Sequence, residues 1–585
     1  MGFILVTSSD ERTWPLNGKI LFLDNWCLNF ERKLIWQKLN YEIYRNNKPT
    51  IEYKIELTAE IRELENKIFG HLVRILNSYQ KTNHTENFWR ILIGHWLRIY
   101  LGTTLSRKHS LEGALKYFNV TGATFINLPN HDLIPKDFES MCKFSDDPLY
   151  GSCLDLRILN SIDSKELDLK TVNDHIEKNI FEKSNPKNEK LTKTKKIVTK
   201  FLWKIPHLFT TNTQAYIGST YLPRFYEFIL QLSFFQTPKN WRMFLDHQVK
   251  ASPDLQLREN LTSLLKESVN EGVITDLLFR IIPICYLEGF HDLVKDTMRS
   301  NLPANPSFIF TSNDFANYEL FKMYAALKSS NNCKYFVGQH GNNYGTNKLV
   351  SPTVEEITCN HFITWGQNEK DDKKLSGFVF KNAGRKYRKK IRTELLLVQH
   401  PLNWTKIDFS SHDTQLYFEA QKRFFELLDT NLYENLIVRL YGGTANSVHS
   451  EISQYRELNN KLRIDTGSER IQNLIEKSKL VIFSYDSTGM LENLSLNIPT
   501  MAFWQFELKH LNAEAQEFYS MLEKVGIVHF TPESIASKVN KVWPDLENWW
   551  NSTDVQKART LFCNRYANIS EQPIRDLRRI IRENI

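Results

Sequence analysis

A histidine flanked by glycines is the clearest candidate for chemistry in this chain of 585 residues. His340 follows the apolar run 334–337 and lies among Gly338, Gly341 and Gly345, which let the backbone bend sharply and approach a ligand closely. An imidazole at such a place can remove the proton of an attacking hydroxyl near neutral pH. A histidine that only caps a turn is the alternative. The placement after a strand favours function, and His340 is our candidate general base.

A second candidate site lies where a predicted strand passes into a predicted helix. Residues 480–483 (LVIF) have the length and composition of a buried strand, and small polar residues starting with Ser484 follow at once. A helix then begins near Ser487 and Thr488, and the unpaired N–H groups of its first turn suit a phosphate. Glu492, about one turn further on, is within reach of ribose hydroxyls. An ordinary helix cap without a ligand would use the same residues, and both interpretations stay open.

Two further residues could contact a phosphate. His400 follows the predicted strand 394–398, and Pro401 stiffens the turn behind it. Arg439 lies in the predicted strand 436–440 and could pair with a phosphate or a carboxylate through two parallel hydrogen bonds. A turn histidine and an ion-paired arginine are the corresponding structural alternatives.

Polar residues also follow predicted strands in the first predicted domain, and parallel α/β sheets bind their ligands at such strand ends. Strands 3–7, 20–23 and 307–311 are followed by such residues, and one further carboxylate precedes Gly289. A turn or cap role is the commoner one for residues of this kind. The candidates are the carboxylates Asp10, Glu11 and Glu288 and the acceptor-binding residues Asn25, Asn313 and Asp314.

The elements that must position these residues alternate between strand and helix, which predicts parallel sheets. The predicted fold class is α/β with two Rossmann-like domains and a large helical insertion in the first. Helices are predicted at 52–79, 88–101, 225–235 and 261–282, and a surface loop or linker at 182–200. The first predicted domain, residues 1–380, binds the acceptor and contains the insertion. The second, residues 381–545, binds the nucleotide. Helices at 546–585 follow and could cross back to the first domain.

Composition narrows the functional classes. The net charge of +8 suits an anionic substrate or a membrane surface and is too small for this length to argue for nucleic acid. Seven scattered cysteines argue against a disulfide framework, and no spacing typical of a metal site or cofactor site is present. No apolar run approaches the ~20 residues of a membrane-spanning helix. We expect a cytoplasmic protein without metal or cofactor, and peripheral association with the inner membrane stays open.

Taken together, these residues resemble a known family. The resemblance covers nearly the whole chain, and it is to the surface-polysaccharide transferases encoded in bacterial O-antigen and capsule regions. Its motifs lie at 5–7, 13–15, 21–23, 26–27, 88–90, 94–97, 283–290, 338–345, 364–366 and 484–492.

A more distant similarity concerns mechanism. The Gln-His-Gly turn, the His-Pro turn and the serine-rich turn are similar to those of two-domain GT-B enzymes that use cytidine nucleotides. These are the CDP-glycerol glycerophosphotransferases and the CMP-ulosonic acid transferases. The similarity implies that His340 is the base and that four residues bind the nucleotide, namely His400, Ser484, Ser487 and Thr488. The helical insertion and Gln339, where the glycerophosphotransferases have tryptophan, favour a sugar donor over CDP-glycerol.

The leading hypothesis is therefore a metal-independent GT-B glycosyltransferase. It would move a sugar, with a nonulosonic or Kdo-like acid from a CMP conjugate favoured, onto a glycan or a lipid-linked acceptor. Base catalysis and phosphate stabilisation suffice for such a donor. The alternatives are a nucleotide-diphosphate-sugar transferase, a CDP-polyol phosphotransferase, a nucleotide-sugar epimerase and a non-catalytic glycan-binding scaffold of the same fold.

Overall fold

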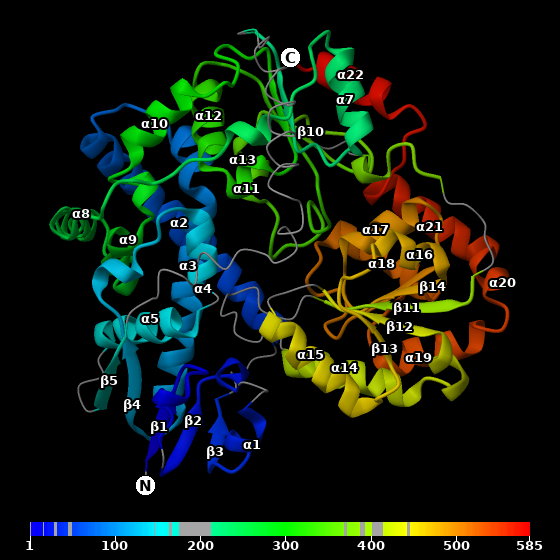
Figure 1. Ribbon diagram of the computed structural model, residues 1–585, viewed down its shortest axis with the longest axis horizontal. Helices are drawn as coiled ribbons and strands as arrows, with labels where there is room; N and C mark the ends of the chain where they lie inside the picture. The colour runs from blue at the N-terminus through cyan, green and yellow to red at the C-terminus, as the bar shows by residue number, and fades with distance from the viewer. Residues whose placement is uncertain are drawn as a thin grey trace, which may run out of the picture. The chain divides into compact units, whose positions relative to one another are not determined.

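The chain forms two compact units in the computed structural model (Figure 1). Unit 1 comprises the described residues of Met1–Ser219 and Phe235–Tyr335, and unit 2 those of Thr220–Phe234, Phe336–Trp404 and His412–Ile585. The structure describes residues 2–15, 17–28, 32–44, 50–145, 147–162, 167–174, 211, 213–367, 371–386, 392–400, 414–441 and 445–585.

A five-stranded parallel sheet with the order β3-β2-β1-β4-β5 opens unit 1. Its strands are β1 (Phe3–Val6), β2 (Lys19–Phe22), β3 (Tyr41–Ile43), β4 (Val120–Asn127) and β5 (Asp168–Asn173). Two further strands of unit 1, β6 (Tyr216–Gly218) and β7 (Ile309–Thr311), pair in parallel with each other. Buried aliphatic residues such as Leu5, Val6 and Leu21 explain why the central strands form.

Helices make up most of unit 1. They are α1 (Lys33–Trp36), α2 (Thr50–Gln80), α3 (Glu86–Tyr117), α4 (Phe138–Ser145), α5 (Pro148–Ser161), α8 (Leu255–Ser268), α9 (Val273–Ile281), α10 (Phe290–Arg299), α11 (Asp314–Asn317) and α12 (Glu319–Ser330). Helix α2 buries Ile61, Leu64, Ile68 and Leu72, the helical spacing of one face, and packs against α3. The hydroxyl of Thr85 caps α3.

Unit 2 is built around a six-stranded parallel sheet with the order β13-β12-β11-β14-β15-β16. These strands are β11 (Glu394–Val398), β12 (Leu436–Arg439), β13 (Arg463–Asp465), β14 (Ser478–Phe483), β15 (Thr500–Phe503) and β16 (Val528–His529). The unit also contains β8 (Tyr335–Gly338), β9 (His361–Ile363) and β10 (Lys374–Leu375), in which β9 pairs in parallel with both others.

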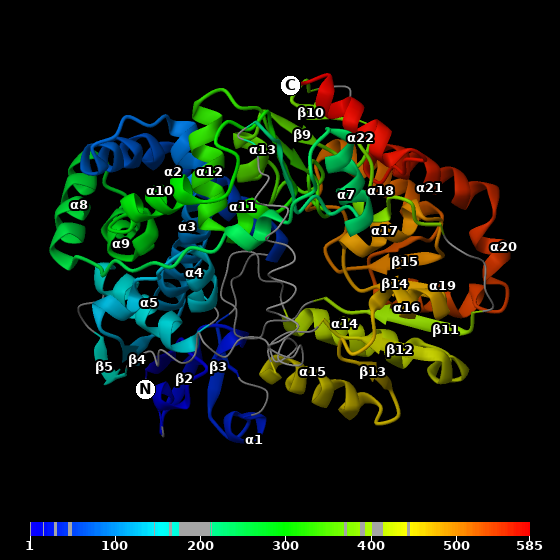
Figure 2. The same ribbon diagram turned by 45° about the horizontal axis from the view of Figure 1, so that its top comes forward.

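The helices of unit 2 are α7 (Arg224–Ser233), α13 (Val354–Thr358), α14 (Thr414–Leu427), α15 (Ala445–Leu458), α16 (Ile471–Lys477), α17 (Thr488–Ser495), α18 (Ala513–Lys524), α19 (Pro532–Val542), α20 (Leu546–Trp550), α21 (Thr553–Tyr566) and α22 (Pro573–Arg582). Several of them cover the two faces of the six-stranded sheet (Figure 2). Alternate strand residues point to opposite faces. Leu396 and Val481 therefore pack with α17, α18 and α21, whereas Leu397 and Ile482 pack with α14 and α19.

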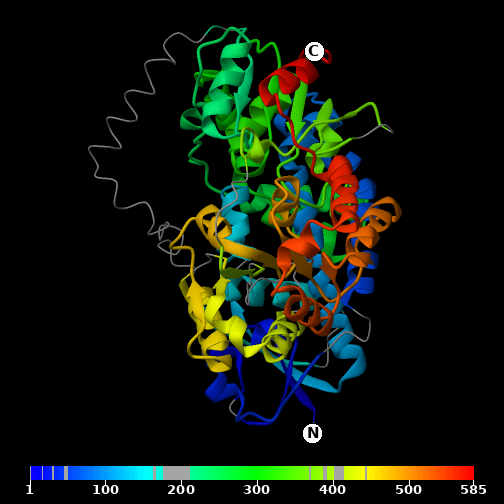
Figure 3. The same cartoon turned by 90° about the vertical axis from the view of Figure 1, so that its right-hand side faces the viewer.

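Helices α7 and α22 pack against each other although they are far apart in the sequence (Figure 3). Among the described helices, none combines the length and the apolar composition that crossing a bilayer requires.

The predicted α/β class with parallel sheets is confirmed. The strands on either side of the long helices form separate sheets, because β6 and β7 pair with none of β1–β5. The helix predicted at 261–282 was wrong as one element: it is α8 and α9, separated at Gly272, whose φ of 58° favours glycine. The predicted loop 182–200 lies outside the described residues, and the predicted domain boundaries stay predictions.

Candidate functional site

Two turns that follow strand ends meet in unit 2. One is the histidine turn (residues 338–345) after β8, and the other is the serine turn (residues 484–488) between β14 and α17. The backbone N–H of Asn342 donates to Thr488 Oγ1 at 3.0 Å. A Cβ on Gly341 would lie 3.1 Å from the same oxygen, so glycine permits this close approach. The structure therefore brings His340 and the Ser487–Thr488 pair, predicted separately, into adjoining turns.

A buried carboxylate fixes the two turns to each other. Asp486, in the serine turn, accepts hydrogen bonds from Asn342 Nδ2 at 2.6 Å and from Tyr519 OH at 3.0 Å. Its other oxygen lies 3.0 Å from His510 Nε2. The side chains of Asp486 and His510 are only 5% and 3% exposed. Because the partners satisfy the carboxylate, its burial is tolerated and the turns are held rigidly.

The histidine turn is also fixed at its start. The side-chain oxygen of Gln339 accepts from the Trp365 backbone N–H at 2.8 Å, and its Nε2 donates to the Gly341 carbonyl at 2.8 Å. The indole of Trp365 in turn donates to the Gln339 carbonyl at 2.8 Å. The glutamine at this position thus holds the backbone that presents His340.

The half-buried ring of His340 belongs to a polar chain. Its Nδ1 lies 3.1 Å from the hydroxyl of Tyr344, and that hydroxyl donates to Glu355 Oε1. Burial, reinforced by the Glu355 carboxylate, raises the pKa of Tyr344 well above its usual value. The ring of Tyr221 lies against His340 at 5.4 Å between centroids. The imidazole is therefore oriented from several sides.

His400 lies beside the serine turn because β11 and β14 are neighbouring strands. Its ring meets that of Tyr485 edge to face at 4.7 Å between centroids, and its backbone N–H donates to Tyr417 OH at 2.9 Å. The same Tyr417 hydroxyl donates to Gln399 Oε1 at 2.6 Å and contacts Ser484 Oγ. Ser484 also donates to the Val398 carbonyl at 3.0 Å. The structure thus gathers His400 and Ser484 around one buried tyrosine.

The start of α17 is capped by its own side chains. Ser487 Oγ accepts from the Met490 N–H at 3.1 Å, as an N-cap residue does. Thr488 Oγ1 accepts from Asn342, as described above. Glu492 pairs with Lys381 at 2.9 Å. The predicted strand, polar turn and helix are all present, while the binding of a phosphate there stays a prediction.

Arg439 makes an ion pair within the sheet. Its Nη1 contacts Asp465 on the neighbouring strand β13 and donates to the Glu469 carbonyl at 2.7 Å. Burial alone would raise the pKa of Asp465, but hydrogen bonds from Ser468, Glu469 N–H and Arg439 bring it below its usual value. The sequence allowed two interpretations of Arg439, an ion pair or a phosphate contact. In the structure its side chain makes the ion pair.

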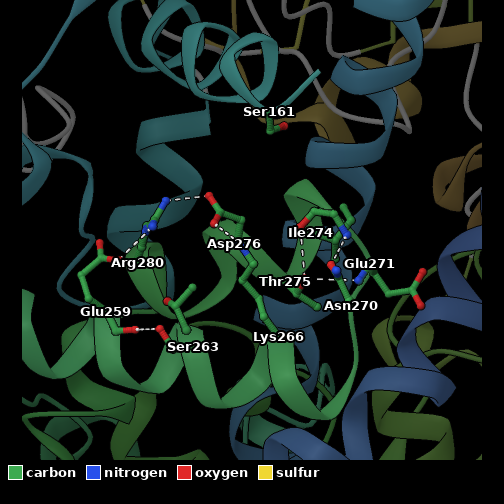
Figure 4. A network of polar contacts seen from close by, with 12 residues as sticks. Ser161, Glu259, Ser263, Lys266, Asn270, Glu271, Ile274, Thr275, Asp276 and Arg280 are labelled. Atoms are coloured by element: carbon green, nitrogen blue, oxygen red, sulfur yellow. Dashed lines mark hydrogen bonds and ion pairs between the residues drawn. The ribbon is translucent and has the colours of Figure 1, made fainter. Parts of the chain in front are cut away.

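Glu288 lies in unit 1 and is held by a buried arginine. Arg258, 1% exposed, donates to both carboxylate oxygens at 2.7 and 2.6 Å. It also donates to the carbonyls of Phe279 and Ile282, so the pair ties α8 to the end of α9. Arg280 of α9 also joins the two helices, since it donates to Glu259 of α8 at 2.8 Å and to Asp276 of α9 at 2.6 Å (Figure 4). This arrangement fits a structural ion pair.

The remaining candidates of the first half are also in unit 1. Asp10 binds Arg12 through both oxygens, and Glu11 pairs with Arg32 at 2.6 Å. The other three follow strands. Asn25 donates its N–H to Asp24 Oδ1, and Asn313 donates its N–H to Thr311 Oγ1. The buried Asp314, at the start of α11, accepts from Tyr216 OH at 2.7 Å and contacts Ser219 and Arg242. His340 belongs to unit 2, and the predicted roles of these unit 1 residues stay predictions.

The sequence did not single out the residues that support these turns, which are Asn342, Tyr344, Glu355, Gln399, Tyr417, Asp486, His510 and Tyr519. Asp486 had a signal, since it lies between Ser484 and Ser487 at a strand end. His510 and Tyr519 had none, because they lie 24 and 33 residues further along the chain. Within the described ranges, no group of three or more His, Cys, Asp or Glu side chains could hold a metal ion.

Three solved structures illustrate what the fold is similar to. MurG of Acinetobacter baumannii shares 11% identity, with 63% of this chain and 99% of that chain covered and a TM-score of 0.32. The wall teichoic acid polymerase TagF shares 10%, with 66% and 98% covered and a TM-score of 0.35. HepE of Anabaena, in complex with UDP-glucose, shares 11%, with 55% and 88% covered and a TM-score of 0.32.

The search of curated proteins returned no match. A model of one protein family, described as LIC12162 family transferase, matches residues 3–581, which is nearly the entire chain. This protein therefore belongs to the LIC12162 family of transferases.

Proposed function

We propose that this transferase moves a sugar from a nucleotide-activated donor to a hydroxyl of a glycan or lipid-linked acceptor, by direct displacement without a metal ion. The observation that carries the proposal is the chain of contacts from His340 through Tyr344 to Glu355, beside the serine turn. A base and a candidate phosphate site are thereby joined in one rigid piece of unit 2. The predicted cytoplasmic location belongs to this proposal.

The contacts of Tyr344 select the tautomer that a base needs. A tyrosine with a raised pKa keeps its single hydroxyl proton, and that proton is donated to Glu355. The phenolic oxygen can then only accept at His340 Nδ1, which must carry the ring proton. The lone pair of the imidazole is left on Nε2, the atom that would take the proton of the acceptor.

The reaction needs three coordinated events. The acceptor oxygen forms a bond to the anomeric carbon, while the bond from that carbon to the donor phosphate breaks and its electron pair stays on the phosphate oxygen. The acceptor proton moves to His340 Nε2. In this proposal, the N–H groups at the start of α17 and the imidazole of His400 stabilise the charge on the departing phosphate.

A CMP-linked ulosonic acid is the donor that we favour. The support is the resemblance of three sequence features to enzymes that use cytidine nucleotides: the histidine turn, His400-Pro401 and the serine turn. Nucleotide-diphosphate sugars and CDP-polyols are the rival donors.

Thermal-shift measurements with CMP, CDP, UDP, GDP and their sugars test the nucleotide. Stabilisation by CMP or its sugar is expected. A response to UDP or GDP alone would remove the cytidine assignment, and no response to any nucleotide would favour a non-catalytic scaffold.

The base is tested with the donor found in that screen. His340→Ala should lower turnover by roughly 10²–10⁴-fold and leave the nucleotide-induced thermal shift intact. His291→Ala, an exposed histidine on α10, is the matched control and should be fully active. Full activity of His340→Ala would withdraw the assignment and return attention to Asp10, Glu11 and Glu288.

A further inference from the structure

Helix α7 exposes a row of large apolar side chains. Phe225, Phe228 and Leu232 are 67%, 46% and 47% exposed. Their spacing places them on one face, while Leu230 and Gln231 are buried on the other. Isolated exposed apolar residues are ordinary, but a continuous row on one helix marks an interaction surface.

The neighbouring helix α22 has the complementary character. It buries Leu577, Ile580 and Ile581 in the unit and exposes arginines on its outer side. Figure 1, Figure 2 and Figure 3 all show α22 beside α7, and the two helices pack against each other. The exposed arginines are Arg575, Arg579 and Arg582, each about one helical turn from the next.

Further basic residues adjoin the same two helices. Gly384 packs so closely on Tyr226 of α7 that a Cβ there would overlap the tyrosine hydroxyl. The next residues, Arg385 and the exposed Lys386, line a cavity of about 510 Å³ together with Arg559. The cavity wall continues through residues 567–569, directly before α22.

We propose that the face formed by Phe225, Phe228, Leu232, Arg575, Arg579, Arg582 and Lys386, called the docking face below, binds an anionic lipid bilayer. Apolar side chains beside arginines match the boundary between acyl chains and phosphate headgroups. The arginines complement the negative surface potential of such a membrane, and the basic cavity can accept one headgroup phosphate. The inference is independent of the transferase chemistry.

A bilayer fits these observations better than a protein partner. The two phenylalanines are exposed on one helix, and the neighbouring carboxylates are engaged within the protein: Glu227 accepts from Thr220, Asp576 accepts from Ser570, and Glu583 pairs with Arg579 at 3.6 Å. A flat anionic surface satisfies both properties at once, whereas a protein partner would need its own matching cavity for each phenyl ring.

Co-sedimentation of the full chain with vesicles tests the proposal. Vesicles of phosphatidylcholine mixed with phosphatidylglycerol should bind the protein, and pure phosphatidylcholine should bind it far more weakly. The triple variant Arg575→Gln, Arg579→Gln and Arg582→Gln should lose about 100-fold in affinity for the anionic vesicles, and added salt should reduce binding of the wild type.

The apolar row is tested by Phe225→Ser, Phe228→Ser and Leu232→Ser combined, which should abolish binding at any salt concentration. Matched controls lie on other helices of unit 2: Leu561→Ser for exposed apolar area, and Lys524→Gln, Lys541→Gln and Lys557→Gln combined for charge. The controls should bind like the wild type, and unchanged melting temperatures exclude misfolding as the cause.

Three results would overturn the proposal. The first is wild-type protein that does not bind anionic vesicles. The second is normal vesicle binding by both triple variants. The third is a dimer in light scattering that the triple serine variant converts to monomer while vesicle binding persists, since the docking face would then be an interface between two copies.

Discussion

Proton transfer at His340 depends on which ring nitrogen carries the hydrogen, and Tyr344 is the residue that decides it. Tyr344→Phe removes the oxygen that accepts from Nδ1 and leaves the ring packing in place. We expect kcat to fall about tenfold while the KM of the donor is unchanged, because one orienting hydrogen bond is lost. The pH profile of kcat should shift as well, since the His340 imidazole loses the Tyr344 hydroxyl that accepts from its Nδ1–H. A variant with wild-type kcat at every pH would show that Tyr344 does not position the base.

Glu451 on α15 is a buried carboxyl whose environment disfavours its charge. Burial raises the pKa of Glu451 to about 8, and its Oε2 has no hydrogen-bond partner among the described residues. Folding raises the pKa of Glu451, so the folded protein keeps this carboxyl neutral at pH values where the unfolded chain ionises it. The contribution of Glu451 to the free energy of unfolding is therefore fully present below its unfolded pKa and is lost as the pH rises toward 8. The expected loss is roughly 1.4 kcal/mol for each pH unit in that window.

Glu451→Gln, which stays neutral, should therefore match the wild type near pH 4 and melt at a progressively higher temperature than the wild type up to about pH 8. Scanning calorimetry across this range measures the difference. Equal melting temperatures at every pH would contradict the shifted pKa.

Among single residues, the sequence predicts those whose role is visible from their immediate neighbours in the chain. The glycines around His340 and the cap position of Ser487 are visible in a few neighbouring letters. The partners of Asp486 are not visible, because Asn342 and Tyr519 reach it only through the folding of distant segments. Arg439 shows the same limit, since the choice between a phosphate and Asp465 depends on which strand lies beside β12.

Strand length and burial explain which elements the sequence predicts. The central strands β11 and β14 are buried on both faces and read as apolar runs. The missed strands are β3, β5, β6, β10, β13 and β16, and each lies at an edge of its sheet. Strands β3, β5 and β13 also carry exposed residues that break the apolar run. An edge strand exists because a neighbour offers hydrogen bonds, and its own sequence need not record this.

One substitution at the start of α17 distinguishes two interpretations of Ser487, an ordinary helix cap and part of a phosphate site. In Ser487→Asp, a carboxylate would cap the helix and suit its dipole, but it would also occupy and repel an anion. If the serine turn holds phosphate, the melting temperature should stay or rise while CMP affinity is abolished. If Ser487 is only a cap, both properties should stay nearly unchanged.

Thr531→Asp is the matched control for this prediction. Thr531 caps α19 in the same way, since its Oγ1 accepts from the Ser534 N–H at 3.1 Å, and it is remote in sequence from both turns. This variant should leave melting temperature and nucleotide affinity alone. Intact CMP affinity in Ser487→Asp would remove the phosphate site from this turn.

For the whole molecule, alternation of strands and helices predicts parallel sheets but not their number. Residues of β1 and β7 have similar apolar character, yet they belong to different sheets. Pairing is decided by which strands the intervening helices bring together, and α3 packs against α2, α5, α9 and α12. The family match along residues 3–581 adds the transferase activity, which no element of the fold specifies by itself.

Hydrogen exchange can show where in the molecule a nucleotide acts. A ligand that binds only the folded protein slows exchange most strongly in the segments it contacts and in those that must open to release it. With the nucleotide that gives the largest thermal shift, we expect added protection in the histidine turn, the serine turn and the first turns of α17. These segments are joined through Asn342, Thr488 and Asp486, so they should respond together. Strands β1–β5 of unit 1, which share no sheet with β8 or β14, should exchange as in the free protein. Protection that appears instead after β1 and β2, around Asp10 and Asn25, would move the nucleotide site into unit 1 and leave the serine turn a structural cap.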